Sequence, residues 1–225
     1  MKNVGMIVAV EMDAVLGRYG APRAKEKVGG FPVLTYELDG VALRVVNSGV
    51  GELAAAAAAE LLICRYDVEL IVNFGVVGGL TEDMAKLRAC VVEKLVHCDF
   101  DLSGIDPLLP GQYPGCDGVY IPTTPELAER AVRLRPELKK VVCASADRFV
   151  GTPEEKRALH ERFGADICEM EAAGVVLTCR RADVPCLLIK TVSDGISGGA
   201  EEFYAEVRRC SELCLEITES IIRNI

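Results

Sequence analysis

The side chains in this sequence that suggest chemistry are acids that directly follow apolar runs. Glu11 and Asp13 follow VGMIVAV, and Ser193 and Asp194 end the stretch that begins with VPCLLIKTV. The carboxyl of Asp194 at the end of a buried strand is partly shielded from water, so it can hold a proton and deliver it near neutral pH, while Glu11 or Asp13 could act as a base. The alternative is that each acid only caps the turn or helix that follows.

A second acidic pattern, ADICEMEAAG, places Glu169 and Glu171 on either side of Met170. If residues 167–171 form an extended strand, Ile167, Glu169 and Glu171 share one face of it. That face would offer several hydrogen-bond acceptors, which suits a diol such as a ribose. The alternative is the first turn of a helix, where the helix dipole favours glutamate.

Two glycine-rich stretches also follow apolar runs. SGVG (48–51) is expected to form a tight turn into a helix, with N–H groups that can face a ligand oxygen. Glu52 follows at once, and a carboxylate in the first helical turn repels phosphate. NFGVVGGL, which contains Val76 and Gly78, is rich enough in glycine to let backbone or ligand approach closely. Neither stretch carries the lysine or arginine that a phosphate site needs.

The elements that must position these groups alternate between strands and helices. Strands are predicted at 4–10, 31–38, 41–49, 68–75, 88–96, 139–145 and 184–192, and helices at 52–64, 124–134, 172–181 and 202–222. Alternation of this kind predicts an α/β fold with a mostly parallel sheet covered on both faces. Residues 99–120, rich in Gly, Pro and Asp, are expected to form a loop. Ligands in such folds gather at the carboxyl ends of strands, where the acids, the glycines and Phe149 fall.

The composition fits one domain, residues 1–225, and argues against several classes of partner. Half of the residues are hydrophobic, enough for a full core, and the net charge of -9 argues against nucleic acid as a partner. The first apolar run is too short to cross a membrane and does not resemble a signal peptide. We therefore expect a cytoplasmic protein that does not act at a membrane.

The ten cysteines are scattered and contain no C-x-x-C pattern. Without a secretory signal, we expect them to be reduced thiols, several of them buried as small apolar side chains. Only His97 and His160 are available as imidazole ligands, so no metal site is expected.

Taken together, the motifs resemble one known family. VGMIVAVEMD resembles its opening GIIGAMEEE, NSGVGELAAAAAAELL its segment SGIGKVAAA, and ELIVNFGVVGGL its segment DVIINTGSAGGL. HCDFD…GQYPG, SADRFVG, ADICEMEAAGVVLTC and VPCLLIKTVSDG are similar, in the same order, to HDAD…GQLPG, SGDAFIN, EMEATAIAHVC and VPFVVVRAISDVAD. From residue 3 to about 222, the sequence therefore resembles the 5'-methylthioadenosine/S-adenosylhomocysteine nucleosidases of the purine nucleoside phosphorylase superfamily. EME and SD at this spacing are the most specific parts of the resemblance.

The resemblance implies a role for each candidate residue. Asp194 would protonate purine N7, with Ser193 orienting it. Asp13 would activate water, with Glu11 as the nearby alternative. The implied substrate-binding residues are Glu171 and Met170 at the ribose, Phe149 stacked on the base, Val150 reading the base edge through its backbone, and Glu169, Val76 and Gly78 beside them.

The resemblance further implies a three-layer αβα fold of the nucleoside phosphorylase type, with a central mixed, mostly parallel sheet. It also implies a homodimer that needs no cofactor. The implied reaction is hydrolysis of the N-glycosidic bond of a purine nucleoside with a modified 5' position, releasing adenine as in methionine salvage. Water is the expected nucleophile, because the glycine turns lack the cations that phosphate needs.

Two alternatives stay open. One is a phosphorylase, or a hydrolase of another nucleoside such as futalosine. The other is a nucleoside-binding protein with a degraded site, which is suggested by Val10, Met12 and Val76 where the family pattern has Met, Glu and Ser.

Overall fold

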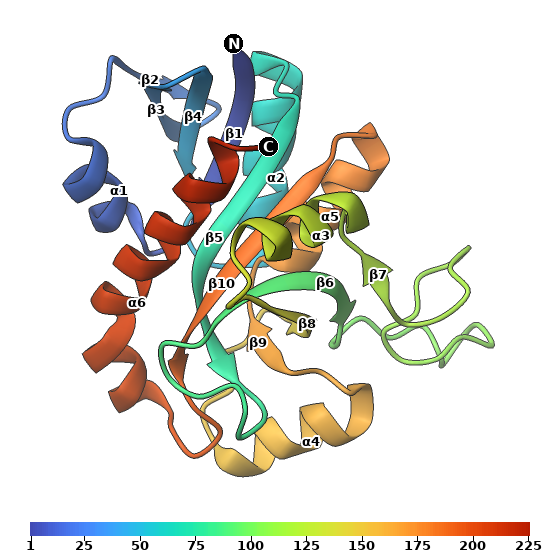
Figure 1. Ribbon diagram of the computed structural model, residues 1–225. Helices are drawn as coiled ribbons and strands as arrows, with labels where there is room; N and C mark the ends of the chain where they lie inside the picture. Colours follow the sequence, from blue (N-terminus) through green and yellow to red (C-terminus); the bar gives the residue numbers. More distant parts are fainter.

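The computed structural model describes residues 1–225, and its centre is a twisted mixed sheet (Figure 1). The strands are β1 (Lys2–Val8), β2 (Ala24–Val28), β3 (Phe31–Leu38), β4 (Val41–Asn47), β5 (Leu70–Gly79), β6 (Ala89–His97), β7 (Ile121–Pro122), β8 (Lys139–Ser145), β9 (Ile167–Glu169) and β10 (Cys186–Asp194). Their order is β10-β6-β8-β9-β5-β1-β4-β3-β2, with β7 on β6. Because β5 also pairs with β10, one end of the sheet curls back on itself.

Parallel pairing joins the central strands, and antiparallel pairing joins the others. β1 is parallel to β4 and β5, β5 is parallel to β10, and β8 is parallel to β6 and β9. Antiparallel pairs connect β2, β3 and β4, and also β10 with β6, β5 with β9, and β6 with β7. The carboxyl ends of the central parallel strands therefore meet at one edge of the sheet.

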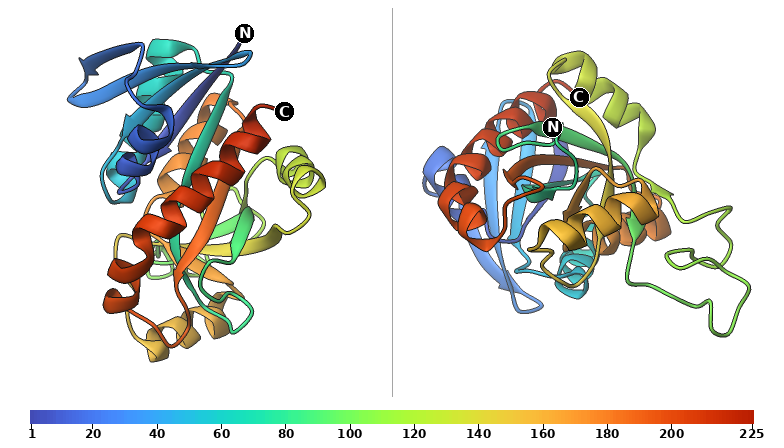
Figure 2. Two further views of the ribbon diagram at one scale, coloured as in Figure 1. Left: turned by 60° about the vertical axis from the view of Figure 1, so that its left-hand side comes forward. Right: turned by 90° about the horizontal axis from the view of Figure 1, so that it is seen from below.

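Helices cover both faces of this sheet (Figure 2). They are α1 (Met12–Tyr19), α2 (Glu52–Tyr66), α3 (Pro125–Leu134), α4 (Pro153–Phe163), α5 (Ala172–Ala182) and α6 (Ala200–Ile222). Neighbouring residues of β1 point to opposite faces, so Ile7 packs into a core with Ala55 of α2, while Met6 packs into a core with Cys214 of α6. α5 belongs to the first core, α1 and α3 to the second, and the predicted three-layer α/β fold is confirmed.

Most predicted elements are found, and the differences have local causes. The prediction missed α1, which buries only Ala14 and Val15. It also missed α4, although Thr152 and Glu155 form a capping box at the start of that helix. β5 runs on to Gly79 rather than ending at residue 75, because its glycines lie within the strand and not in a turn.

The predicted loop at residues 99–120 is confirmed. This segment contains no helix or strand and projects from the body of the protein (Figure 2), and we call it the arm. None of the helices combines the length and the apolar composition that crossing a membrane requires.

Candidate active site

The sheet register brings the predicted site segments side by side. Asp194 at the end of β10 pairs with Gly78 of β5, and Gly78 pairs with Cys168 of β9 on its other side. Glu169, the next residue of β9, pairs with Ser145 at the end of β8. Only β5 therefore separates Asp194 from the EME segment, and the predicted meeting of these strand ends is confirmed.

Asp194 is almost fully enclosed, with 1% of its surface exposed. Its Oδ1 accepts a hydrogen bond of 2.8 Å from the Ser193 hydroxyl, and its Oδ2 accepts one of 2.6 Å from Lys156 Nζ. Ser193 therefore contacts the Asp194 carboxyl directly. Lys156 was not expected at the site, because it lies in the strongly charged segment TPEEKRALHERF, whose pattern predicts solvent exposure.

The glycines of NFGVVGGL let acidic side chains approach β5. A Cβ atom on Gly78 would lie 3.0 Å from Cys168 Sγ and 3.3 Å from Asp194 Oδ2. A Cβ atom on Gly75 would lie 2.7 Å from Glu11 Oε1. A larger residue would therefore displace the Glu11 carboxylate at position 75, and would crowd the Cys168 thiol and the Asp194 carboxylate at position 78.

The two candidate bases, Glu11 and Asp13, have different surroundings. Glu11 is buried, and its Oε2 accepts from the N–H groups of Ala9 at 3.0 Å and Val10 at 2.9 Å. Its Oε1 accepts from the N–H of Val76 at 3.0 Å, which fastens the end of β1 to β5. Asp13 lies in the first turn of α1 and is exposed.

Glu169 is bound on all sides by the protein itself. Its carboxylate accepts from the Ser145 hydroxyl at 2.7 Å, from Lys190 Nζ at 3.1 Å and from the N–H of Ala172 at 2.9 Å. Of the two alternatives for this segment, an extended strand through Glu171 does not hold, because the strand ends at Glu169 and α5 begins directly after Glu171. Glu169 instead satisfies the free N–H groups at the start of α5, and it does not share a face with Glu171.

Glu171 has a carboxyl group that is buried and only partly satisfied. It is 8% exposed, and only its Oε1 accepts a hydrogen bond from the chain, from the N–H of Gly51 at 2.9 Å. Burial, followed by the negative charge of Glu169, raises the pKa of Glu171 to about 7. The charge of Lys190 acts in the opposite direction. This carboxyl can therefore change its charge near neutral pH.

Aromatic and apolar side chains complete this edge. Phe149, in the loop after β8, is 49% exposed and packs edge-to-face on Phe203 of α6, with 5.9 Å between ring centroids. Val150 is buried, while Met170 and Val76 are half-buried. The exposed face of Phe149 is thus free to stack on a planar ligand.

The start of α2 is tied to the arm by His97, the first residue of the HCDFD motif. His97 Nε2 lies 2.9 Å from Glu52 Oε2 and 2.8 Å from Asp99 Oδ1, and Nδ1 lies 2.7 Å from the Tyr113 hydroxyl. Burial lowers the pKa of His97, but the hydrogen bond and charge of Glu52 and the charge of Asp99 outweigh it, so the pKa is raised. We call His97, Glu52, Asp99 and Tyr113 the histidine clamp. No group of three or more His, Cys, Asp or Glu side chains is arranged to hold a metal ion.

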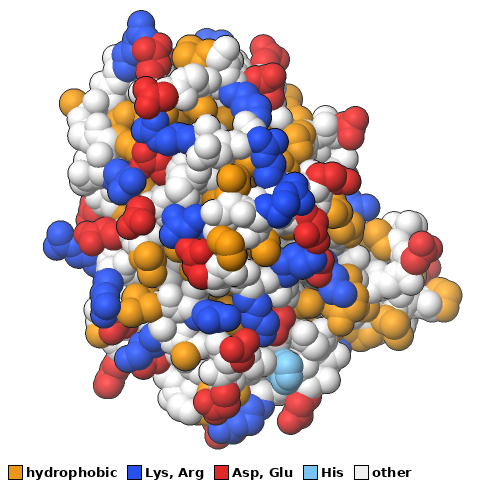
Figure 3. Space-filling view, in the orientation of Figure 1, with side chains coloured by type: hydrophobic (Ala, Val, Ile, Leu, Met, Phe, Trp, Pro, Cys, Tyr) orange, Lys and Arg blue, Asp and Glu red, His pale blue; other side chains and the backbone are white.

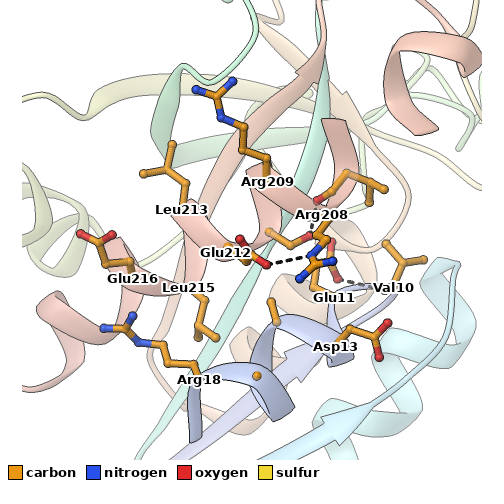
Figure 4. A pocket seen from close by; sticks show the side chains of 14 residues that line it. Val10, Glu11, Asp13, Arg18, Arg208, Arg209, Glu212, Leu213, Leu215 and Glu216 are labelled. Atoms are coloured by element: carbon orange, nitrogen blue, oxygen red, sulfur yellow. Dashed lines mark hydrogen bonds and ion pairs between the residues drawn. The ribbon is translucent and has the colours of Figure 1, made fainter. Parts of the chain in front are cut away.

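A cavity of about 850 Å³ opens beside this edge, between α1 and α6. Figure 4 shows Glu11 and Asp13 on one side of it and the Arg208–Glu212 ion pair of α6 on the other. Neither Asp194 nor Glu171 lines this cavity. It adjoins the candidate site and does not contain the two carboxyl groups expected to act on a substrate.

Comparison with known proteins places these features in context. A family model described as "Phosphorylase superfamily" matches residues 4–223. The 5'-methylthioadenosine/S-adenosylhomocysteine nucleosidase of Hydrogenovibrio crunogenus is 29% identical over 198 residues, with 85% of each chain covered. The aminodeoxyfutalosine nucleosidase of Helicobacter pylori is 29% identical over 200 residues, with 86% of each chain covered.

Solved structures agree with the fold. The 5'-methylthioadenosine/S-adenosylhomocysteine nucleosidase of Helicobacter pylori with butyl-thio-DADMe-Immucillin-A has a TM-score of 0.93 and 26% identity, covering 100% of this chain and 99% of that one. The native futalosine hydrolase of Helicobacter pylori also has a TM-score of 0.93 and 26% identity, covering 100% of this chain and 98% of that one.

Proposed function

The chain belongs to the phosphorylase superfamily, and from that premise we propose that it hydrolyses the N-glycosidic bond of a purine nucleoside. Relatives at 29% identity are named as nucleosidases for 5'-methylthioadenosine/S-adenosylhomocysteine and for aminodeoxyfutalosine. The proposed substrate is a nucleoside with a modified 5' position, and the proposed product is free adenine, as in methionine salvage. Residues 1–225 would act as one domain without a cofactor.

The observation that carries this proposal is the enclosed carboxyl of Asp194, held in place by Ser193 and Lys156. When an N-glycosidic bond breaks, its electron pair goes to the purine ring. Protonation of N7 lets the base leave as a neutral molecule. A positioned acid contributes about 10²–10⁴-fold to the rate of such a step.

The sugar and the base have their own proposed contacts. Glu171 would accept hydrogen bonds from the ribose hydroxyls, and its negative charge would stabilise the positive charge that develops at C1'. Phe149 would stack on the base, and the backbone of Val150 would read the base edge. Met170 would lie beside the sugar.

Water is the proposed nucleophile, for a reason visible at the start of α2. The N–H of Gly51 donates to Glu171, and the N–H of Glu52 donates to Asp147 Oδ1 at 2.7 Å. These N–H groups are the ones a phosphate would need at a helix start, and two carboxylates of the protein occupy them. This arrangement favours hydrolysis over phosphorolysis.

We assign activation of the water to Asp13, the position that the resemblance implies. The carboxylate of Glu11 has about four lone-pair directions, and N–H groups of the chain already occupy three of them. Glu11 is therefore better suited to hold β1 against β5 than to accept a proton from water. The exposed carboxylate of Asp13 has its lone pairs available.

A homodimer is proposed from the shape and surface of the arm. Ile105 is 81% exposed, and Leu109 is also exposed, although both are apolar. Apolar side chains gather on this projection (Figure 3), and the exposed Val50 and Leu53 flank the start of α2. Exposed apolar side chains grouped in this way are typical of a protein–protein contact.

The same chemistry on futalosine-type nucleosides is the second candidate, since the two kinds of relative are equally similar at 29% identity. The test is to incubate the protein with 5'-methylthioadenosine, S-adenosylhomocysteine, aminodeoxyfutalosine and inosine, each with and without phosphate. Free base would be separated by chromatography. We expect base release from a 5'-modified adenine nucleoside that does not depend on phosphate.

Other outcomes would replace this proposal. Release only with phosphate would indicate a phosphorylase. Calorimetric binding of an adenosine analogue without product would indicate a binding protein with a degraded site. Neither binding nor base release from any nucleoside would contradict the proposal outright.

A further inference from the structure

Lys156 of α4 is a charged side chain with no exposed surface. Its Nζ lies 2.6 Å from Asp194 Oδ2, 2.7 Å from the carbonyl oxygen of Gly195 and 3.1 Å from that of Gly198. The ammonium group therefore has three close acceptors, and only one of them is charged. Its single ion-pair partner is the carboxyl that the proposed function assigns as the acid.

Lys156 is unusual among the charged residues of α4 because it is buried, whereas its neighbours Glu154 and Arg157 are exposed. Taking an ion out of water is costly, and a buried charge persists only with a close partner. Lys156 and Asp194 therefore depend on each other to remain charged inside the protein.

No other charged side chain contacts Asp194. Glu202 of α6 lies beside the loop that follows β10. Its carboxylate accepts a hydrogen bond of 2.8 Å from the N–H of Gly195 and forms an ion pair of 2.9 Å with Lys86. The thiols of Cys168 on β9 and Cys210 on α6 are the other titratable groups nearby, and burial raises their pKa values to about 12 and about 11. Both thiols are neutral near pH 7, which leaves Lys156 as the proton source in direct contact with Asp194.

We propose that Lys156 is a positioning residue that keeps a proton in reserve for Asp194 and passes it on during base departure. This inference rests on the proposed nucleosidase function. In the resting site Asp194 is a carboxylate that accepts hydrogen bonds from Ser193 and Lys156. An acid without this partner would be active only at pH values where it holds its own proton.

The step balances as follows. The C1'–N9 bond breaks, and its electron pair enters the purine ring. N7 takes a proton through Asp194, and Asp194 receives the ammonium proton of Lys156. Lys156 remains as a neutral amine that still donates to the carbonyl groups of Gly195 and Gly198. Water adds to C1' and gives its proton to Asp13, the proposed base. After the purine base has left, water reaches Asp194, and Lys156 recovers its proton through that carboxyl group.

The test compares the pH dependence of kcat/KM in the wild type, Lys156→Met and Lys156→Gln. Without the cation, the buried Asp194 must take its proton from solvent, so activity falls about tenfold per pH unit once that proton is lost. In both variants we expect kcat/KM to begin its decline at alkaline pH at least one pH unit lower than in the wild type. At about pH 5.5 the rates should be near that of the wild type. Gln can still donate a hydrogen bond but supplies no proton, so a wild-type profile for Lys156→Gln would overturn the proposal.

A stability measurement separates this role from simple packing. Relative to the wild type at the same pH, Lys156→Met should lose more stability at about pH 8 than at about pH 5.5, because an unpaired buried carboxylate is costly only when it is charged. The double variant Lys156→Met with Asp194→Asn lacks both charges of this pair, so its stability relative to the wild type should be the same at the two pH values. A loss of stability in Lys156→Met that is equal at both pH values would overturn the proposal.

Arg157→Gln is the matched control, because it removes the same charge from an exposed position of the same helix. Its profile should match the wild type. If the wild type releases no base from any nucleoside, the proposed function fails and this inference falls with it. If the wild type is active and the alkaline limb of Lys156→Met is unchanged, only the inference about Lys156 fails.

Discussion

Glu169 and Glu171 are two residues apart, yet the structure gives their carboxyl groups different surroundings. Glu169 is held by Ser145, by Lys190 and by the start of α5, so the protein satisfies it. Glu171 is buried with one hydrogen bond, and its pKa is raised to about 7. The two glutamates of EME therefore have different tasks: the Glu169 carboxylate caps the start of α5, and Glu171 Oε2 accepts no hydrogen bond from the chain.

At the scale of this residue, the raised pKa of Glu171 predicts how stability depends on pH. Between its ordinary value of 4.5 and the folded value of about 7, the folded protein holds more protons than the unfolded chain. Stability therefore falls as pH rises through this window, by up to about 3 kcal/mol for this group. Glu171→Gln removes this titrating group. The free energy of unfolding of the variant, measured in urea, should therefore rise relative to that of the wild type as pH goes from about 5 to about 8.

The exposed Glu161 of α4 provides the control for this measurement. Glu161→Gln should follow the wild type at both pH values. A difference between the wild type and Glu171→Gln that does not change with pH would show that burial of Glu171 has no such cost.

The choice between Asp13 and Glu11 gives a second prediction at this scale. Asp13→Asn should lower kcat by about 10²–10⁴-fold with little change in melting temperature, since Asp13 is exposed. Glu11→Gln should instead lower stability by about 1–3 kcal/mol, because an amide NH₂ would face backbone N–H groups. If Glu11→Gln were folded but inactive while Asp13→Asn stayed active, the base that activates water would be Glu11 instead of Asp13.

At the scale of elements, the sequence predicts the strands better than it predicts their ends. β3 and β8 have the predicted bounds because each is a short apolar run between turn residues. The predicted strand ends at residue 75 because glycine usually marks a turn. In the structure β5 continues to Gly79, and Gly78 makes room for Cys168 and Asp194. Such crowding depends on residues far away in the chain, which no local pattern contains.

The candidate site shows the same limit. Acids at strand ends and the meeting of those ends could be predicted, because parallel strands place their carboxyl ends at one edge. The partner of Asp194 could not be predicted from the sequence. Lys156 lies 38 positions earlier, on a helix whose charged pattern indicates a surface exposed to solvent. The histidine clamp was missed for a similar reason, because it joins α2 to the arm across the fold.

The histidine clamp gives a prediction about these two elements. His97→Gln should destabilise the protein and speed proteolysis within the arm, because Glu52 would lose its partner in a buried position. The raised pKa of His97 means that its stabilisation is present below its ordinary value of 6.5 and is lost as pH rises through the folded value. The difference in unfolding free energy between wild type and variant should therefore shrink as pH is raised.

His160, the other histidine of the chain, is exposed on α4 and provides the control. His160→Gln should leave the rate of arm proteolysis unchanged. Equal proteolysis of the wild type and His97→Gln at about pH 6 would show that the clamp does not hold the arm.

At the scale of the whole molecule, closure of the sheet is what assembles the site. β5 pairs with β1, β10 and β9, so it carries Val76 to Glu11 and Gly78 to Asp194. Acidic and basic side chains are interspersed on the face seen in Figure 3. The arm projects from the body of the molecule, and the proposed dimer depends on its exposed apolar side chains (Figure 2).

Ile105→Asp tests that dimer. A charge placed in an apolar contact is costly to desolvate, so sedimentation should shift from twice the monomer mass toward the monomer. Leu16→Asp is the control, since Leu16 is an exposed apolar residue of α1, away from the arm. A monomeric wild type, or a dimer that Ile105→Asp leaves intact, would contradict the proposal.

The central claim is that the carboxyl at position 194 supplies the proton to the departing base. Asp194→Asn alone would leave Lys156 buried without a partner, which costs about 3–5 kcal/mol, so the decisive variant combines Asp194→Asn with Lys156→Met. The measurement is chromatographic release of free base, without phosphate, from the nucleoside that the wild type cleaves fastest. We predict that the folded double variant releases base at least about a hundredfold more slowly than the wild type. Release at the wild-type rate would contradict the account.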